Sequence, residues 1–193
     1  MNRQNALLKT AALTFAACMG VVCSCTASSQ HAGHDHAAAA AGTGKSATAV
    51  LKGKDGSKVN AKVVFKEGPD GVKVVAHIEG VEGGGVRGFH LHEVGDCTPP
   101  DFTSAGSHFN PTGAPHGAPT APQHHAGDLG NVTIGADGGA HYEIISRGLT
   151  VGPGPNSVVG RSVILHEKAD DMTTQPTGNA GGRVACGVVK ADA

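Results

Sequence analysis

The sequence is poor in leucine, in net charge and in long hydrophobic runs, and each shortage excludes a class of protein. Only eight of the 193 residues are Leu, against 20 Val, so strand formers outnumber helix formers and a helical bundle is excluded. Fifteen Lys and Arg balance 16 Asp and Glu, which argues against a nucleic-acid partner held by bulk positive charge. Trp is absent, whereas there are 12 His, the commonest metal ligand among the side chains.

The one hydrophobic run near the N-terminus, residues 11–22, is too short to span a bilayer, which takes about 20 residues. Because Arg3 and Lys9 precede it, we predict an export signal over residues 1–25. Val22-Cys23-Ser24-Cys25 resembles a bacterial lipobox and favours lipidation of Cys25. The alternative is cleavage after Cys25-Thr26-Ala27, a small-x-small pattern that would release a protein without a lipid. Both readings predict an exported protein of the periplasm or cell envelope.

Residues 26–45 have no apolar periodicity and are predicted to form a flexible tether. This segment contains a histidine-rich tract, His31, His34 and His36. The tract is consistent with weak capture of copper or zinc, and equally with a solvated linker that happens to contain histidine. Both readings stay open.

The body of the chain, residues 46–193, contains only two cysteines, Cys97 and Cys186. In an exported protein an even pair is expected to be oxidised, although two buried thiols are the alternative. We therefore predict a disulfide, which would close a loop of about 90 residues and stabilise the fold by about 4 kcal/mol in the chain-entropy description.

The body also predicts an all-β protein. Residues 61–66 and 72–78 alternate apolar and polar residues around a Gly-Pro-Asp-Gly turn, which predicts a hairpin with one buried face. Residues 131–134 and 142–146 flank a second turn and predict a second hairpin. Later strands are expected at 162–165 and 184–189. This spacing favours an antiparallel β-sandwich or barrel, interrupted by long and therefore functional loops at 93–128 and 167–183.

Several histidines of the body are placed to form a metal centre. His90 and His92 are two residues apart on a predicted strand, so both point to one face, and His166 ends another strand. The first long loop adds four histidines and an aspartate: His108, His116, His124, His125 and Asp128. Any one of them alone is more often a surface residue, but the set indicates a metal centre. His77 and His141 are expected to be solvated.

These segments resemble the copper/zinc superoxide dismutase family, of the exported bacterial kind. The resemblance covers the chain from about residue 47 to its end and rests on five motifs that occur in the family's order: Gly88-Phe-His-Leu-His-Glu93, Ser104-Ala-Gly-Ser-His-Phe-Asn-Pro111, Gly127-Asp-Leu-Gly-Asn131, His166-Glu-Lys-Ala-Asp-Asp171 and Gly178-Asn-Ala-Gly-Gly-Arg-Val-Ala-Cys-Gly187. It implies a Greek-key, immunoglobulin-like β-sandwich or barrel with long metal-binding and electrostatic loops.

The resemblance also implies a role for each matching residue. The copper ligands would be His90, His92, His108 and His166. The zinc ligands would be His108, which bridges the two metals, with His116, His125 and Asp128. Asp170 would link His90 to His116, Arg183 would attract and position the substrate anion, and Cys97 and Cys186 match the bacterial disulfide. His124 could compete with His125 for zinc, but the His-x-Gly-Asp spacing favours His125.

The function implied is dismutation of superoxide to O2 and hydrogen peroxide through a Cu(II)/Cu(I) cycle with a structural zinc ion, protecting the cell envelope. One departure from many relatives is that residues 172–178 contain no Lys or Arg, so steering of superoxide depends on Arg183, on Lys168 or on residues elsewhere. The alternatives are a copper- and zinc-buffering lipoprotein without dismutase activity, and a structural sandwich that uses zinc only for stability. The sequence does not favour a monomer or a homodimer.

Overall fold

Short runs of alternating residues separated by glycine-rich turns give eight β-strands in the computed structural model, which describes residues 44–193. The only helical element in this part of the chain is a single 3-10 turn, Thr103–Ala105. The strands are β1 (Ser46–Gly53), β2 (Asn60–Gly68), β3 (Gly71–Glu79), β4 (Gly85–His92), β5 (Asp128–Ile134), β6 (Ala140–Ser146), β7 (Ser162–His166) and β8 (Arg183–Ala191).

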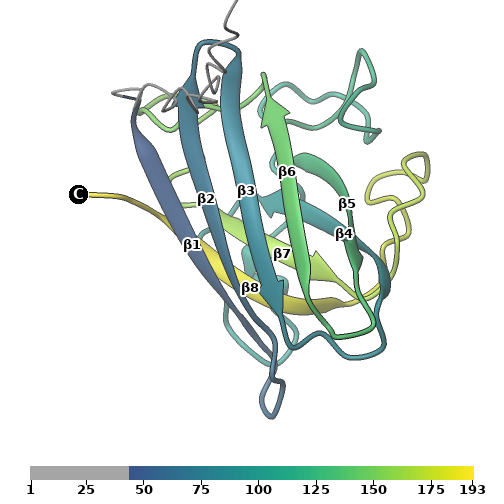
Figure 1. Cartoon of the computed structure of the whole chain (residues 1–193). Coiled ribbons are helices and arrows are strands. Elements are labelled where there is room, and N and C mark those ends of the chain that lie inside the picture. Colours follow the sequence, from purple (N-terminus) through teal and green to yellow (C-terminus); the bar gives the residue numbers. More distant parts are fainter. Residues whose placement is uncertain (1–43) are drawn as a thin grey trace, which may run out of the picture. The chain divides into compact units, whose positions relative to one another are not determined.

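The eight strands form one sheet in the order β5-β4-β7-β8-β1-β2-β3-β6, and every neighbouring pair is antiparallel. The sheet curls so that β1, β2, β3 and β6 face β4, β5, β7 and β8, giving a nearly closed barrel (Figure 1). The chain crosses from one half to the other between β3 and β4, between β5 and β6, and between β6 and β7. These crossovers confirm the predicted all-β antiparallel Greek-key class.

Alternating burial along β2 and β3 confirms the first predicted hairpin. Val63 and Phe65 on β2 are fully buried, as is Val74 on β3, whereas Lys73 and His77 are exposed. Burying one such side chain stabilises the fold by about 1.5–3 kcal/mol. The alternation therefore gives the sheet one face toward the core and one toward water.

The second predicted hairpin is wrong in its pairing. Both strands exist, but β5 pairs with β4 and β6 pairs with β3, so β5 and β6 are the two edges of the sheet. The turn between them, closed by a hydrogen bond from the Gly135 N–H to the Gly139 carbonyl, crosses from one half of the barrel to the other. A turn motif is a local signal that the chain reverses. It does not determine which strands share hydrogen bonds.

Long connections lie where the sequence predicts them, at 93–127 and 167–182, and a third at 147–161 was not anticipated. The predicted disulfide between Cys97 and Cys186 is confirmed and joins the 93–127 connection to β8. Its half-cystines pack with Phe102, Ala105 and Ile164 in a small apolar cluster beside the main core. The connection is thus anchored to the sheet near its beginning.

The predictions for the N-terminal region concern residues mostly outside the described range. The export signal at 1–25, the lipidated Cys25 and the histidines of the tether at positions 31, 34 and 36 all lie outside residues 44–193. Within the described range, no helix is long and apolar enough to cross a membrane.

Candidate metal centre

The strand β4 places two histidines on one side of the sheet. His90 and His92 alternate with Leu91, which is fully buried in the main core. His166 is the last residue of the neighbouring strand β7. A β-bridge between His92 and His108 brings the 93–127 connection against the end of β4.

Four buried histidines consequently converge, each offering one ring nitrogen within 4.8 Å of the others. We call them the four-histidine group: His90, His92, His108 and His166.

Hydrogen bonds on the far side of two of these rings fix the nitrogens that face inward. The Nδ1–H of His92 donates to the Gly106 carbonyl at 2.9 Å, and that of His166 donates to the Gly181 carbonyl at 3.4 Å. Their Nε2 atoms therefore carry lone pairs, and they lie only 3.4 Å apart. Two acceptors facing each other at that distance fit a cation between them.

Two further ring nitrogens of this group are buried without a hydrogen-bond partner, Nδ1 of His90 and Nε2 of His108. A buried unsatisfied polar atom costs about 1–3 kcal/mol, so it is retained where a ligand satisfies it. The two nitrogens supply the remaining ligands of a four-nitrogen metal site, and the residues fit a bound copper ion.

A second group, which we call the mixed group, consists of His108, His116, His125 and Asp128. Oδ1 of Asp128 lies 2.9 Å from Nδ1 of His108, 3.0 Å from Nδ1 of His116 and 3.2 Å from Nδ1 of His125. Three imidazole nitrogens and one carboxylate oxygen are the donor set of a closed tetrahedral zinc site. The other oxygen, Oδ2, accepts the N–H groups of Gly117 and His125 and so holds the carboxylate in place.

His108 belongs to both groups, one through each ring nitrogen. Its Nδ1 faces Asp128 and its unpartnered Nε2 faces the four-histidine group. A single imidazole therefore connects the two candidate metal positions.

Asp170 makes a second connection between the groups. Its Oδ2 accepts from Nε2 of His90 at 2.8 Å, and its Oδ1 accepts from Nε2 of His116 at 3.0 Å. Both histidines are therefore left with Nδ1 free to bind metal. Asp170 therefore contacts both His90 and His116, the two histidines that the resemblance would have it link.

Two amide side chains for which the sequence predicted no role hold Asp170 and His116 in place. Asn131 exchanges two hydrogen bonds of 2.8 Å with the backbone of Asp170, and Gln175 exchanges two of 2.8 Å with the backbone of His116. The partners are 39 and 59 residues apart in sequence, so no local pattern indicates them.

Gly178 is required where the second long connection passes this network. Its φ is +65°, and an added Cβ would lie 1.7 Å from Oδ1 of Asp170 and 2.6 Å from Nε2 of His116. Only glycine leaves room for the hydrogen bond between those two side chains.

Arg183 begins β8, next to the four-histidine group. It donates to the carbonyl oxygens of Phe102 at 2.5 Å and Gly106 at 2.6 Å, and the latter oxygen also accepts from His92. Burial lowers the pKa of Arg183 from its ordinary value, but the guanidinium stays charged at neutral pH. The disulfide at Cys97 fixes the connection that supplies both carbonyls.

Burial favours the neutral imidazole at three histidines of the four-histidine group. It holds the pKa of His90 and of His92 well below the usual histidine value, and it lowers the pKa of His166 to about 4. Burial raises the pKa of the Asp128 carboxyl, but the contact with His108 and the hydrogen bond from Gly117 outweigh it and bring the pKa below its usual range. Neutral imidazoles and an ionised carboxylate are the protonation states that bind metals.

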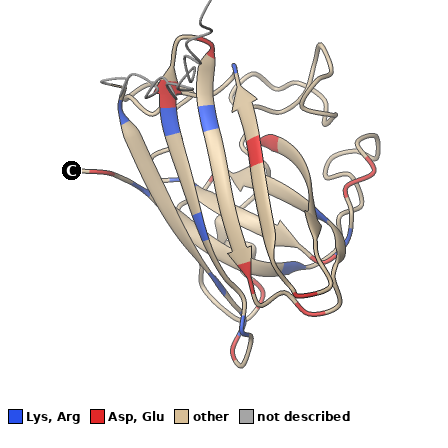
Figure 2. Cartoon of the chain, viewed as in Figure 1, with Lys and Arg blue, Asp and Glu red and all other residues tan. Residues whose placement is uncertain are grey.

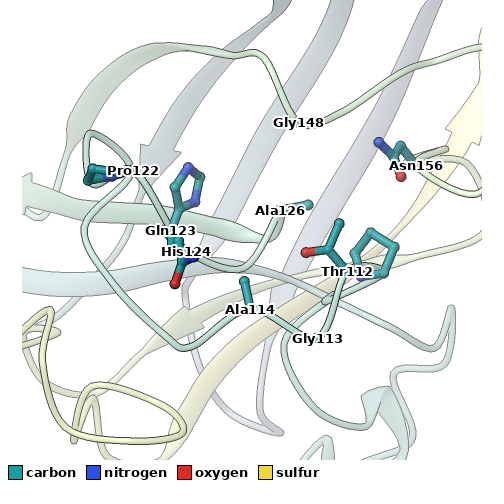
Figure 3. Close-up of a pocket in the computed structure, with 10 residues that line it drawn as sticks. Thr112, Gly113, Ala114, Pro122, Gln123, His124, Ala126, Gly148 and Asn156 are labelled. Carbon is teal, nitrogen blue, oxygen red and sulfur yellow. The ribbon is translucent and has the colours of Figure 1, made fainter.

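The structure separates the two adjacent histidines that the sequence left in competition. His125 is in the mixed group, whereas Nδ1 of His124 lies 2.7 Å from the His125 carbonyl and the ring lines a surface pocket of about 440 Å³ (Figure 3). The pocket contains no other titratable side chain. His124 therefore contributes no atom to either group.

A Greek-key β-barrel whose strands and loops together build two candidate metal groups around one shared histidine has the architecture of a dinuclear metalloprotein. Comparisons with known proteins agree. The family model described as "Copper/zinc superoxide dismutase (SODC)" matches residues 59–189. An extracellular Cu-Zn superoxide dismutase from Brugia pahangi is 41% identical over 155 residues, which are 75% of this chain and 76% of the relative.

A solved structure has the same fold. The crystal structure described as that of the clock protein EA4 is 40% identical in sequence and superposes with a TM-score of 0.69, covering 77% of this chain and 95% of its own. The chain belongs to the copper/zinc superoxide dismutase family: it is an oxidoreductase whose cofactors are copper and zinc.

Proposed function

We propose that this protein dismutates superoxide with copper in the four-histidine group and zinc in the mixed group. In the overall reaction, two superoxide anions and two protons give O2 and hydrogen peroxide. The observation that carries the assignment is His108, whose two ring nitrogens face one group each while Asp170 spans the same two groups. Family membership and this cluster support dismutation.

Copper, when bound, supplies the one-electron redox couple that oxidises one superoxide and reduces the next. The chain positions the ligands: β4 and β7 hold three of the four histidines at fixed register. His108 is the proposed proton carrier, since its Nε2 has no other partner while its Nδ1 stays directed at the mixed group. The contact of Nδ1 with the mixed group keeps the imidazole of His108 in place when its Nε2 takes up a proton.

Arg183 is the proposed anion-binding residue. Two backbone carbonyls beside the four-histidine group hold its guanidinium, so the positive charge is preorganised where a small anion must arrive. Lys168 is exposed on the same connection as Asp170, and it is proposed to assist steering. Residues 172–178 contain no Lys or Arg to add to this positive charge.

We further propose that the protein is exported and protects the cell envelope. The matched relative is named as an extracellular enzyme, and the Cys97–Cys186 disulfide is typical of an oxidising compartment. The bacterial lipoprotein assignment, with the lipid on Cys25, rests on the sequence of residues 1–25 alone.

The test of activity is superoxide consumption by the copper- and zinc-loaded protein, with and without cyanide, which binds copper. We expect fast, cyanide-inhibited consumption that is lost in His166→Ala. Tight binding of both metals without dismutation would overturn the proposal and support the metal-buffering alternative.

The test of anchoring is the fractionation of a full-length chain expressed in a bacterium with lipoprotein processing. If Cys25 is lipidated, we expect the unmodified sequence in the membrane fraction and the Cys25→Ser variant in the soluble exported fraction. The same soluble distribution for both chains would contradict lipidation and favour cleavage after Ala27.

A further inference from the structure

Two exposed histidines outside the metal centre face each other on the outer surface of the barrel. His77 on β3 and His141 on β6 are direct register partners, and their ring centroids are 4.6 Å apart. Each was expected from the sequence to be a solvated residue on its own. Because β3 and β6 are hydrogen-bonded neighbours, the two histidines lie side by side.

The distance between their facing nitrogens suits a shared metal ion. Nδ1 of His77 lies 3.2 Å from Nδ1 of His141. Two nitrogens bound to one ion at 2.0–2.1 Å, with an angle between 90° and 109°, are about 2.8–3.4 Å apart. The pair therefore has the spacing of two ligands of one ion.

Glu143 determines which nitrogen of His141 is free. Its Oε1 lies 3.2 Å from Nε2 of His141, and an ionised carboxylate only accepts, so Nε2 carries the proton and Nδ1 carries the lone pair. The hydrogen bond from Lys73, whose Nζ lies 2.8 Å from Oε2, is the main cause that lowers the pKa of Glu143, and His141 adds to it. A carboxylate behind a metal-binding histidine is the usual arrangement that orients such a ligand.

The surroundings leave the pair open to an ion from solution. The His141 side chain is 54% exposed, so water can occupy the remaining coordination positions. Lys62 on β2 is the register partner of His77 on the other side, and Glu79 follows two residues along β3 on the same face. Basic and acidic side chains both occur on β2 and β3, and β6 adds an acidic one (Figure 2), so the surface around the pair does not carry charge of positive sign alone.

We propose that His77 and His141 form a second, exposed binding site for a divalent transition-metal ion, held through both Nδ1 atoms with Glu143 orienting His141. In the metal-free pair the Nδ1–H of His77 donates to Nδ1 of His141; when the ion binds, that proton moves to Nε2 of His77, and both Nδ1 lone pairs face the ion. A two-imidazole site binds Cu2+ more tightly than Ni2+ or Zn2+. The site uses β3 and β6, none of whose residues belongs to the four-histidine or mixed group.

The test uses the full chain already loaded with copper and zinc. Calorimetry measures its affinity for Ni2+, and NMR line broadening of the histidine ring signals locates the bound ion. His31, His34 and His36 are first replaced by Gln, so that the N-terminal tract contributes no binding. We expect one Ni2+ to bind and to broaden the ring signals of His77 and His141. His77→Gln and His141→Gln should each weaken binding at least tenfold, and Glu143→Gln should weaken it about tenfold.

The matched control is Lys62→Gln, which changes the neighbour of His77 and removes no ligand. It should leave Ni2+ binding unchanged or slightly tighter, and dismutation should be the same in all these variants. Unchanged Ni2+ affinity in His77→Gln and His141→Gln, or broadening confined to other histidines, would overturn the proposal. Neither result depends on the proposed dismutase activity.

Discussion

The two metal groups differ in what holds their ligands. Three histidines of the four-histidine group lie on β4 and β7, within the hydrogen-bonded sheet. The mixed group takes His108, His116 and His125 from the 93–127 connection, and only Asp128, the first residue of β5, from a strand. One group is therefore positioned mainly by the backbone ladder and the other mainly by side-chain hydrogen bonds.

This difference indicates which group needs its metal to keep its shape. A β-ladder holds ring positions whether or not an ion is present, because each strand has two bonded neighbours in the interior of the sheet. Apart from the β-bridge at His108, the histidines of the 93–127 connection lie outside any ladder, so they depend on the Asp128 carboxylate, on Asp170 and on Gln175. Zinc is thus expected to organise the connection, whereas copper is expected to enter a site that is largely formed.

The largest expected effect comes from removing the residue common to both groups. His108→Ala should lower dismutation more than about 100-fold and weaken both copper and zinc, because loss of a direct ligand exceeds the 10–100-fold cost of losing an outer partner. His166→Ala should abolish activity while zinc stays bound. Metal analysis after dialysis, together with superoxide consumption, checks this contrast, and His124→Ala is the control. Full zinc retention in His108→Ala would contradict the shared role.

The next effect is expected at Gly178. Gly178→Ala places a methyl group against Oδ1 of Asp170, so it should break the contact with His116 and weaken zinc binding by about 10–100-fold. Gly56→Ala is the matched control, because its φ of +79° is similarly strained but nothing lies within 4 Å of the added Cβ. Competition with a zinc chelator measures the difference. Equal zinc affinity in Gly178→Ala and Gly56→Ala would contradict the prediction, because it would mean that the methyl group against Asp170 does not weaken zinc binding.

Acidification should destabilise the metal-free protein. The pKa of His166 falls from 6.5 to about 4 through burial, so the unfolded chain binds more protons between these values and stability decreases as pH falls through that window. His166 alone should reduce the free energy of unfolding by about 2 kcal/mol between pH 7 and pH 5. Urea denaturation of the metal-free protein at both pH values checks this. A midpoint that does not change would contradict the buried neutral imidazole.

The smallest effect is expected at Gln175, which contacts only one of the two groups. Gln175 bonds only the backbone of His116, so Gln175→Ala should weaken zinc about tenfold and leave copper unaffected. Asn131→Ala releases Asp170, which contacts both groups, and should weaken both metals. Separate titrations of each metal distinguish the two variants. Loss of copper in Gln175→Ala would mean that the groups are not held independently.

Residue types and local spacing indicated that a metal centre exists, since the two-residue spacing of His90 and His92 puts them on one strand face. The ligand sets and the position of Asp170 were implied only by the resemblance to the copper/zinc superoxide dismutase family. The structure brings all of these residues together. Their supporting residues, Asn131 and Gln175, could not be predicted, because an amide that bonds a distant backbone leaves no periodicity in the chain.

Side-chain alternation and ligand chemistry are properties of neighbouring residues, so the strands, their buried faces, the disulfide and the donor atoms available for metal follow from the amino-acid pattern. Three features appear only in the folded chain: β5 and β6 lie at opposite edges of the sheet instead of forming a hairpin, each imidazole turns one particular nitrogen inward, and His77 meets His141. Each of these depends on contacts between segments far apart in the chain, where sheet closure and burial select among several locally equivalent arrangements.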